Sequence, residues 1–257
     1  VDRQRVFDLL GGRLPAREPQ QEAYRLLLVA ACNGYHGAMP FLFEPIADYT
    51  ELLMPDDLLS AGSILQAVRD ALTADACKDE EVIGWLYQFY IAEKKEAVDE
   101  KVKAGGKVEA DELPAKTSLY TPDWIVRFLV ENSLGRLWLL NRPQSKLAER
   151  MKYLVVSDQL SVVSAEPGQA GASQLTAAHC QLATPEDIRI ADSAAGSGHM
   201  LLYAFDLLYA IYAEEGYNPP DIPRLILEKN LYGMEIDARS AALAAFALTM
   251  KARRYDR

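Results

Sequence analysis

A strand, a glycine turn and a long helix follow one another late in the chain, and this order constrains the fold most. The run Ile188-Arg-Ile-Ala191 predicts a short strand that ends at Asp192. Gly196 and Gly198 then predict a tight turn, because glycine adopts backbone conformations that a Cβ atom disfavours. The apolar run from His199 to Glu214 predicts a helix. This pattern is typical of the first unit of an open α/β sheet.

A second strand with a polar end follows this unit. Leu231-Tyr-Gly-Met-Glu235 predicts the strand, and a further helix is predicted from Asp237. The carboxyl ends of parallel strands meet at one edge of a sheet, where ligands bind. We therefore expect Asp192 and Glu235 to face the same crevice, where a carboxylate can accept two hydrogen bonds from a ribose diol.

The glycine turn differs from the common nucleotide-binding motifs. A dinucleotide fingerprint needs a third glycine and an acidic residue about 20 positions on, whereas Glu235 lies 37 residues after Gly198. The sequence also contains no P-loop pattern. An acid before a short Gly-Ser-Gly suits a ligand with an amino-acid end and a nucleoside end, and S-adenosylmethionine fits that description. The alternative is a structural turn without a ligand.

The region before this pattern, residues 20–96, is predicted to be helical. Its helix signals lie at Gln20–Ala31, at a start near Met54-Pro55-Asp56, at Ser63–Leu72 and at Glu81–Lys95. The last run carries an apolar stripe formed by Val82, Trp85, Leu86, Phe89 and Tyr90. Because such stripes normally face a core, we expect these aromatic residues, and Trp124 and Trp138 with them, to be buried.

Two further segments complete the predicted organisation. Residues 97–116 are charged and contain glycine, which is typical of a linker or an exposed loop, and residues 157–184 resemble a flexible insertion. Between them, Thr121-Pro122-Asp123 predicts the start of a helix that runs to about Leu140, with Thr121 as the cap. We divide the chain into a helical N-terminal domain with its linker (1–115) and the incomplete first part of an α/β domain (116–257).

Composition excludes several classes of protein. The chain has 27 Lys and Arg against 37 Asp and Glu, and its net charge of −10 argues against a surface covered by basic patches. Cys32, Cys77 and Cys180 are far apart, which predicts no metal site and no disulfide framework, but reduced thiols in the cytoplasm. The N-terminus is polar, and the most apolar stretch, Met200 to Ala213, is short and contains Asp206. We therefore expect no signal peptide and no membrane span.

Three motifs resemble those of amino-group DNA methyltransferases. Asp192-Ser-Ala-Ala-Gly-Ser-Gly-His-Met-Leu201 resembles their D-P-A-C-G-S-G-H-F-L motif, although Ser193 and Ala195 replace Pro and Cys. Tyr232-Gly-Met-Glu-Ile-Asp237 is similar to their second motif, whose acid holds the ribose. Tyr120-Thr-Pro122 resembles the early motif that closes over the methionine end of the cofactor, and the order of the three motifs matches the gamma-type arrangement.

Longer phrases narrow the resemblance to one family. Glu81–Lys95, Thr121–Trp138 and Asn230–Arg239 are similar to the BREX phage-defence adenine methyltransferases, the PglX family, and the likeness spans roughly residues 20–253. It implies a Rossmann-like class I domain that transfers a methyl group from S-adenosylmethionine to the N6 atom of an adenine flipped out of duplex DNA. It also implies cofactor contacts by Tyr120, Thr121, Pro122, Asp192, Ala194, Gly196, Gly198, Glu235 and Ile236.

The catalytic motif of that family is expected outside this sequence. Asn218-Pro-Pro-Asp221 is similar to its Asn/Asp-Pro-Pro-aromatic pattern, but Asp221 cannot stack on a flipped base. This run also precedes the second strand, whereas the family's motif follows the fourth, so we interpret it as a proline-rich turn. We therefore expect an excised, inactive piece without catalytic residues. The rest of the sheet, the target-recognition region and most of the surface for double-stranded DNA would follow residue 257.

Two other functions stay open. One is a methyltransferase that acts on a protein glutamine or on RNA, since those enzymes share the cofactor motif. The other is an interaction module that docks other defence proteins or a phage inhibitor. Among the remaining polar residues, His199 is expected to be structural. Lys251, Arg253 and Arg254 are expected to form a solvated helix end rather than a DNA contact.

Overall fold

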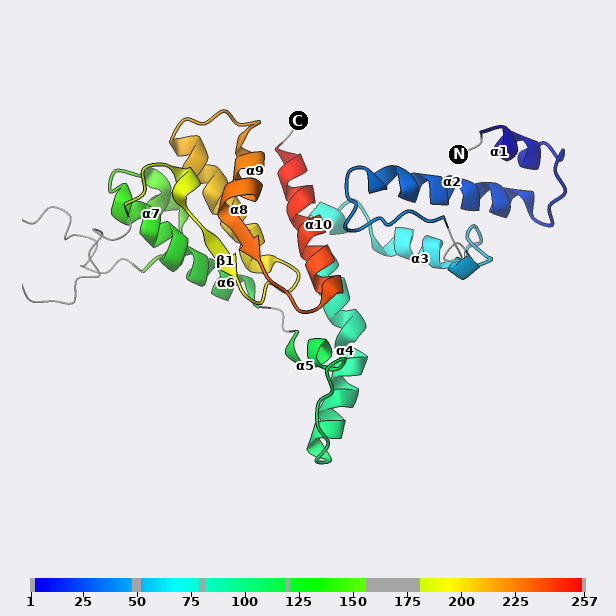
Figure 1. Ribbon diagram of the computed structural model, residues 1–257, viewed down its shortest axis with the longest axis horizontal. Coiled ribbons are helices and arrows are strands. Elements are labelled where there is room, and N and C mark those ends of the chain that lie inside the picture. Colours follow the sequence, from blue (N-terminus) through cyan, green and yellow to red (C-terminus); the bar gives the residue numbers. More distant parts are fainter. Residues whose placement is uncertain (1–2, 48–51, 79–81, 119–120, 156–180, 256–257) are drawn as a thin grey trace, which may run out of the picture. The chain divides into compact units, whose positions relative to one another are not determined.

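The computed structural model describes residues 3–47, 52–78, 82–118, 121–155 and 181–255, and it divides into two compact units. The first unit comprises Val1–Val82 and the second Ile83–Arg257 (Figure 1). The division falls before the predicted boundary at residue 115. The helices that follow Val82 are therefore part of the second unit in the structure, while the predicted boundary between functional domains stays a prediction.

The first unit is helical, as predicted. It contains α1 (Arg3–Leu10), α2 (Pro19–His36), α3 (Ile64–Ala71) and the 3₁₀ turn Ala76–Lys78. The helix start predicted near Met54 is wrong. Arg25 of α2 donates to the carbonyl oxygens of Met54 and Pro55, 3.4 and 3.1 Å away, and these contacts hold the segment in bends and turns. The next helix begins only after Ser63, whose hydroxyl accepts from the Gln66 amide.

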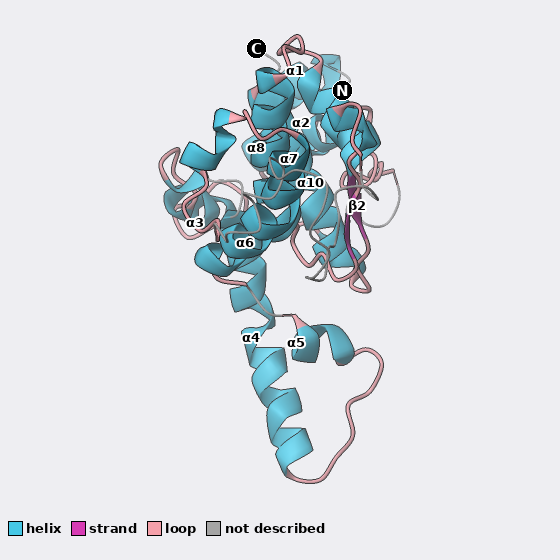
Figure 2. Ribbon diagram, turned by 90° about the vertical axis from the view of Figure 1, so that its left-hand side faces the viewer, coloured by secondary structure: helices cyan, strands magenta, loops and turns pink. Residues whose placement is uncertain are grey.

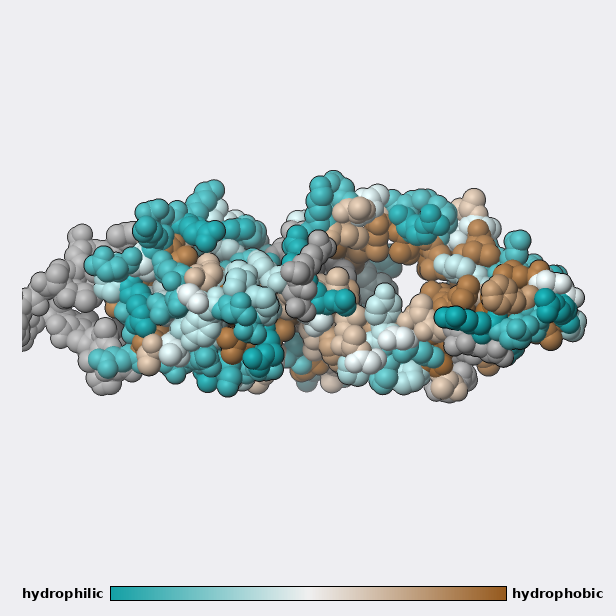
Figure 3. Space-filling view, turned by 90° about the horizontal axis from the view of Figure 1, so that it is seen from above, coloured by the Kyte–Doolittle hydropathy of each residue, from teal (hydrophilic) through white to brown (hydrophobic). Residues whose placement is uncertain are grey.

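The apolar core of the first unit is thin. Its buried apolar side chains are Val6, Leu9, Ala23, Met39 and Leu58. Many larger apolar side chains of the same unit are exposed, and Figure 3 shows apolar surface gathered over it. The most exposed are Phe7, Leu10, Leu52, Leu53 and Ile64. Isolated exposed apolar residues are normal, but a group of this kind marks a surface that apolar atoms can cover.

The second unit begins with a helical hairpin. Its arms are α4 (Val82–Lys103) and α5 (Leu113–Thr117), which lie side by side in Figure 2. Lys101 binds both carboxylate oxygens of Glu112, at 3.0 and 2.9 Å, and Lys116 pairs with Asp99. The prediction of a linker or exposed loop over 97–116 is therefore wrong for residues 97–103, which belong to α4, and for residues 113–116, which belong to α5. The charges that indicated a solvated loop pair across the hairpin instead.

The predicted order of strand, glycine turn, helix, strand and helix is confirmed, but both strands are shorter than predicted, and Glu235 lies in the loop after the second strand instead of ending it. β1 (Ile190–Asp192) and β2 (Leu231–Gly233) are parallel, with Ile190 opposite Leu231 and Asp192 opposite Gly233. The connection contains α8 (His199–Glu214), α9 (Ile222–Leu225) and the π-helical turn Ile226–Asn230. After β2 comes α10 (Ala238–Arg254), which Asp237 caps (Figure 1).

A third helical segment packs against α8. It consists of α6 (Asp123–Val130), the π-helical turn Glu131–Gly135 and α7 (Arg136–Asn141), which confirms the helix predicted to about Leu140. Its predicted start is off by one position. Pro122 stands at the N-cap, and no side chain caps the helix there. The 3₁₀ turns Lys146–Arg150 and Pro185–Asp187 follow later in the chain.

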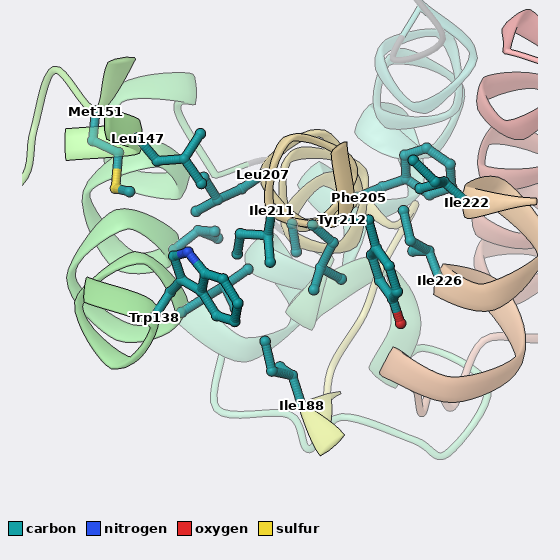
Figure 4. Packing of buried hydrophobic residues seen from close by; sticks show 14 of the residues in the cluster. Trp138, Leu147, Met151, Ile188, Phe205, Leu207, Ile211, Tyr212, Ile222 and Ile226 are labelled. Atoms are coloured by element: carbon teal, nitrogen blue, oxygen red, sulfur yellow. The ribbon is translucent and has the colours of Figure 1, made fainter. Parts of the chain in front are cut away.

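These segments bury one apolar cluster. Trp138 of α7 packs with α8, α9 and the turn after α9, and Figure 4 shows their side chains converging. The fully buried members are Trp138, Phe205, Leu208, Ile211, Tyr212, Ile222 and Ile226. The cluster lies beside both strands, so it supports the sheet whose ends form the candidate site.

Three further predictions concern absences or undescribed residues. Most of the predicted insertion, and Tyr120 and Cys180 with it, lies outside the described residues. In the part of the chain that the structure describes, no helix combines the length and apolar content needed to cross a bilayer. Within those same residues, no three His, Cys, Asp or Glu side chains gather in a way that could hold a metal ion.

Candidate cofactor site

A buried asparagine aligns the two strands that carry the candidate site. Asn230 directly precedes β2, and its side-chain amide donates to the carbonyl oxygens of Pro185 and Ile188, each 2.9 Å away, just before β1. Its own oxygen accepts from the Tyr212 hydroxyl at 2.9 Å. The polar atoms of this fully buried side chain are therefore paired, and they tie the start of β2 to the approach to β1. Sequence reasoning missed Asn230, although a polar residue at the border of an apolar strand was the available signal.

The loops that follow the strands lie side by side, as predicted. The Met234 amide donates to the Asp192 carbonyl at 2.8 Å, and the Ala195 amide donates to the Met234 carbonyl at 2.9 Å. These bonds continue the pairing of the strands past their ends. The glycine turn and the loop that carries Glu235 are thereby held next to each other at one edge of the sheet.

The two glycines of the turn have different roles. Gly198 has a φ of 87°, and a Cβ there would lie 3.0 Å from the Ala244 Cβ, so glycine lets α8 begin close against α10. Gly196 has a φ of 54°, but a Cβ on it would meet no atom within 4 Å. The backbone at Gly196 therefore faces open space, where a ligand can approach it closely.

The carboxylate of Glu235 bridges the two loops. Its Oε2 accepts from the Gly196 amide at 2.7 Å, and its Oε1 accepts from the Asp237 amide at 2.9 Å. Asp192 differs, because the described bond of its carboxylate is local: Oδ1 accepts from the Ala194 amide at 3.1 Å. The structure therefore brings the two predicted acids to one edge of the sheet but gives only Glu235 contacts with both loops.

Asp237 supports this arrangement from the start of α10. Its carboxylate accepts from the Arg239 amide at 3.2 Å, from the Ser240 hydroxyl at 3.0 Å and from the Tyr87 hydroxyl of α4. Burial alone would raise the pKa of Asp237, but the hydrogen bonds from Tyr87 and Ser240 outweigh it and lower that pKa below 3.8. Burial and the Asp237 charge raise the pKa of Tyr87, which keeps its hydroxyl a donor. Sequence reasoning did not predict the Tyr87 contact.

An apolar cavity of about 310 Å³ opens beside Glu235. Its walls come from β2, α8, the turn before β2 and α10, and Glu235 is the charged residue among them. The small residues Ala241, Ala244 and Ala245 of α10 form one side. An apolar cavity next to one anchored carboxylate has the general character of a small-molecule site.

Comparison with known proteins gives the site a context. No protein-family model matches the chain. The chain is 47% identical over 240 residues to "Adenine-specific methyltransferase BrxX" of Escherichia coli O9:H4 (strain HS). It is 38% identical over 239 residues to "Adenine-specific methyltransferase PglX" of Lacticaseibacillus casei (strain Zhang). The chain is a homologue of part of these two methyltransferases.

The similarity covers very different shares of the proteins. It spans 93% and 91% of this chain but 19% of each methyltransferase. The predicted resemblance to BREX adenine methyltransferases is therefore confirmed for most of the chain. The activity named for these two relatives belongs to proteins about five times longer than the matched segment.

The predicted early motif lies directly before α6. Thr121 is half-buried, and Pro122 is exposed. The helix they precede is fixed to α8, because the fully buried Glu131 accepts from the Tyr203 hydroxyl at 2.7 Å and the Arg127 guanidinium lies 4.7 Å from the centre of the Tyr203 ring. Cofactor contacts by Thr121, Pro122, Ala194 and Ile236 stay predictions. Ala194 and Ile236 are both exposed at the strand ends.

The proline-rich run of this methyltransferase homologue is a turn, as predicted. The Asn218 side chain donates to the Asp221 carboxylate at 2.9 Å, and the Asp221 amide donates to the Asn218 carbonyl. These bonds close the turn between α8 and α9. The side chains of Pro219 and Pro220 are exposed on it.

Several predictions about single side chains need correction. Trp138 is fully buried, as expected, but Trp85 and Trp124 are 51% and 56% exposed. Phe89 and Tyr90 of the predicted apolar stripe are also exposed, at 75% and 71%. These side chains are exposed because, among the described residues, none covers their helix faces completely. Lys251 is also not part of a solvated helix end, since its ammonium lies 2.8 Å from the Asp206 carboxylate of α8.

Proposed function

We propose that the chain is the cofactor-binding part of a cytoplasmic, site-specific DNA methyltransferase of a BREX phage-defence system. The enzyme would transfer a methyl group from S-adenosylmethionine to the N6 atom of an adenine flipped out of duplex DNA. The similarity of more than nine-tenths of the chain to two proteins named adenine-specific methyltransferases carries this proposal. Because the chain spans about a fifth of those proteins, the reaction, the DNA substrate and the partners all belong to the proposal.

A Rossmann-like class I domain is part of the same proposal. Two parallel strands with a helical connection are the repeating unit of such sheets. Here α8 connects β1 to β2, and the polar side chains stand at the carboxyl ends of both strands. Parallel sheets are normally buried on both faces, whereas Tyr232 of β2 is 47% exposed. This exposure supports a larger sheet in the complete domain.

The residues at the strand ends fit S-adenosylmethionine. Glu235 uses one hydrogen bond on each oxygen, so each oxygen keeps a lone pair for a ribose hydroxyl. The open backbone at Gly196 leaves room for the amino-acid end of the ligand, a space that a side chain would enter. Ile236, which is 72% exposed, offers an apolar side chain next to Glu235 for the adenine ring. When bound, the cofactor supplies the methyl group.

The acceptors for the target amino group are assigned to residues outside this sequence. The only Asn-Pro-Pro run ends in Asp221 and forms the closed turn between α8 and α9. We therefore predict that these 257 residues contribute the binding site for S-adenosylmethionine but do not methylate DNA by themselves. Methylation of DNA by the isolated 257-residue chain would overturn this part of the proposal.

Calorimetry with the protein at its full natural length tests the cofactor site. Removal of two charge-assisted hydrogen bonds by Glu235→Ala should weaken S-adenosylmethionine binding roughly 10- to 100-fold. Glu228→Ala is the matched control, since this exposed carboxylate pairs with Arg224 before β2 and touches neither loop. Equal binding by the Glu235→Ala variant and the unchanged protein would disprove the site.

The substrate class needs a separate measurement. The same protein is given S-adenosylmethionine with a labelled methyl group and offered duplex DNA, RNA and protein substrates. We expect label on the N6 atom of adenine in DNA. Label confined to RNA or to a protein glutamine would replace the DNA proposal by the alternative methyltransferase reaction.

A second candidate function, docking of another protein, is favoured by the exposed face of α4. Its apolar patch comprises the aromatic residues Trp85, Phe89 and Tyr90 together with Leu86, which are between 47% and 75% exposed. Exposed aromatic residues in a cluster are typical of the centres of protein interfaces. The proposed occupant is another protein of the defence system or a phage inhibitor. Loss of its co-purification on the double change Phe89→Ser and Tyr90→Ser would support docking, and unchanged co-purification would contradict it.

A further inference from the structure

One face of α4 contacts both loops of the candidate cofactor site. Gly84 lies against the glycine turn, where a Cβ would stand 2.5 Å from the Ser197 Oγ and 2.9 Å from its Cβ. Both distances are too short for a side chain, so the helix can lie this close only because residue 84 is glycine. Three residues later, on the same face of the helix, Tyr87 donates its hydroxyl hydrogen to the Asp237 carboxylate.

These contacts close a ring of interactions around Glu235. Tyr87 binds the Asp237 side chain, and the Asp237 amide binds the first oxygen of Glu235 at 2.9 Å. The second oxygen of Glu235 accepts from the Gly196 amide at 2.7 Å. The next residue of the turn is Ser197, and its side chain lies against Gly84 of α4. The carboxylate is therefore held from two loops, and one turn of α4 holds both loops.

The protonation states of Tyr87 and Asp237 favour the hydrogen bond between them. Burial and the neighbouring carboxylate raise the pKa of its hydroxyl, so it stays protonated and donates throughout the physiological range. The Asp237 carboxylate has a lowered pKa and stays ionised over the same range. The Tyr87 ring also lies 6.2 Å from the Tyr90 ring in a stacked arrangement.

We propose that Tyr87 is a positioning residue for S-adenosylmethionine, acting through Asp237 on the orientation of Glu235. The inference rests on the proposed function, because it takes Glu235 as the acceptor of the ribose hydroxyls. A carboxylate already fixed by two loops loses little side-chain freedom when it binds a ligand, and such preorganisation strengthens binding. The helix that sequence reasoning assigned to a separate domain therefore supports, through Gly84 and Tyr87, the two loops that carry the cofactor site.

The test is Tyr87→Phe in the protein at its full natural length. This variant keeps the ring and its stacking but removes the hydroxyl. We expect the dissociation constant for S-adenosylmethionine to rise roughly 3- to 10-fold, which corresponds to one side chain that must be ordered on binding. The KM for the cofactor should rise by the same factor, while kcat at saturating cofactor stays nearly unchanged. Tyr35→Phe is the matched control, since Tyr35 is half-exposed on α2 in the first unit.

A double-variant cycle separates positioning from a general structural effect. In a Glu235→Gln background, Tyr87→Phe should weaken binding less than about 2-fold, because the contact it orients is already impaired. Equal losses in both backgrounds would show that Tyr87 acts independently of Glu235. That result would overturn the inference.

A second variant tests the other end of the ring. Gly84→Ala favours the helix by its intrinsic propensity, so α4 is expected to form, while the new methyl group pushes Ser197 away. Binding of S-adenosylmethionine should weaken in the native background but not in a Ser197→Gly background, which lacks the colliding atoms. Equal weakening in both backgrounds would contradict the contact.

The outcomes distinguish this inference from the proposed function. If the unchanged protein does not bind S-adenosylmethionine, the proposed function fails, and the positioning role toward that ligand fails with it. If the unchanged protein binds the cofactor and both Tyr87→Phe and Gly84→Ala bind it equally well, only the role of α4 is overturned.

Discussion

The helices α4 and α8 both carry apolar residues at helical spacing, yet one is largely exposed and the other is buried. Nine residues of α8 are buried, among them the fully buried Phe205 and Tyr212. On α4, Phe89 and Tyr90 are 75% and 71% exposed. Apolar spacing therefore identifies which face of a helix is apolar, but it does not tell what covers that face.

The difference comes from the neighbours of each helix. Helix α8 packs against α6, α9, α10 and the turns beside the strands, so its apolar side chains meet partners on several sides. On α4, the buried apolar residues Ile91 and Val98 belong to the part that forms the hairpin with α5. The first turns of α4 instead contribute the polar contact of Tyr87 and the close approach of Gly84.

The largest predicted effect on stability concerns the buried helix α8. Phe205→Ala should lower the free energy of unfolding by roughly 3–5 kcal/mol, because it opens a cavity in the centre of the cluster. Urea denaturation of the chain, followed by far-ultraviolet circular dichroism, measures the change. A loss below about 1 kcal/mol would mean that the cluster is loosely packed around Phe205.

Asn230 tests whether a buried polar residue matters as much as its apolar neighbours. Asn230→Ala removes the partner of the Tyr212 hydroxyl and of two carbonyl oxygens, and it should cost roughly 1–3 kcal/mol. Hydrogen exchange should also increase at the amides of β1 and β2, since the residue ties their starts together. Asn218→Ala, in an exposed turn, is the matched control and should change stability by less than about 0.5 kcal/mol.

Local signals explain what the sequence could predict. Asp192, the two glycines of the turn and the apolar run after them lie within one short stretch, and α8 begins and ends at the predicted residues. The hairpin of α4 and α5 was missed because its ion pairs Lys101–Glu112 and Asp99–Lys116 join residues 11 and 17 positions apart. The bond from Tyr87 to Asp237 joins residues 150 positions apart, and no local pattern in the sequence carries such a contact.

A smaller effect is predicted for the carboxylate that caps α10. Asp237→Asn keeps a capping side chain but loses the charge near the helix start, and it should cost about 1 kcal/mol at neutral pH. The folded pKa of Asp237 is depressed, so its extra stability is present above the unfolded value and is lost as the pH falls through the folded one. The difference in unfolding free energy between the two proteins should therefore shrink below about pH 4. A difference that stays constant to pH 2.5 would contradict the depressed pKa.

The smallest predicted effect on stability concerns the exposed face of α4. Phe89→Ala removes the same side chain as Phe205→Ala, but at a position that is 75% exposed, and should change the free energy of unfolding by less than about 0.5 kcal/mol. Measured under identical conditions, the two phenylalanine variants isolate the effect of burial from that of chemistry. If the Phe89 variant is as destabilised in the protein at its full natural length as the Phe205 variant, residues outside this chain cover the α4 face. A small change in both the chain and the full-length protein would leave that face open for a separate protein.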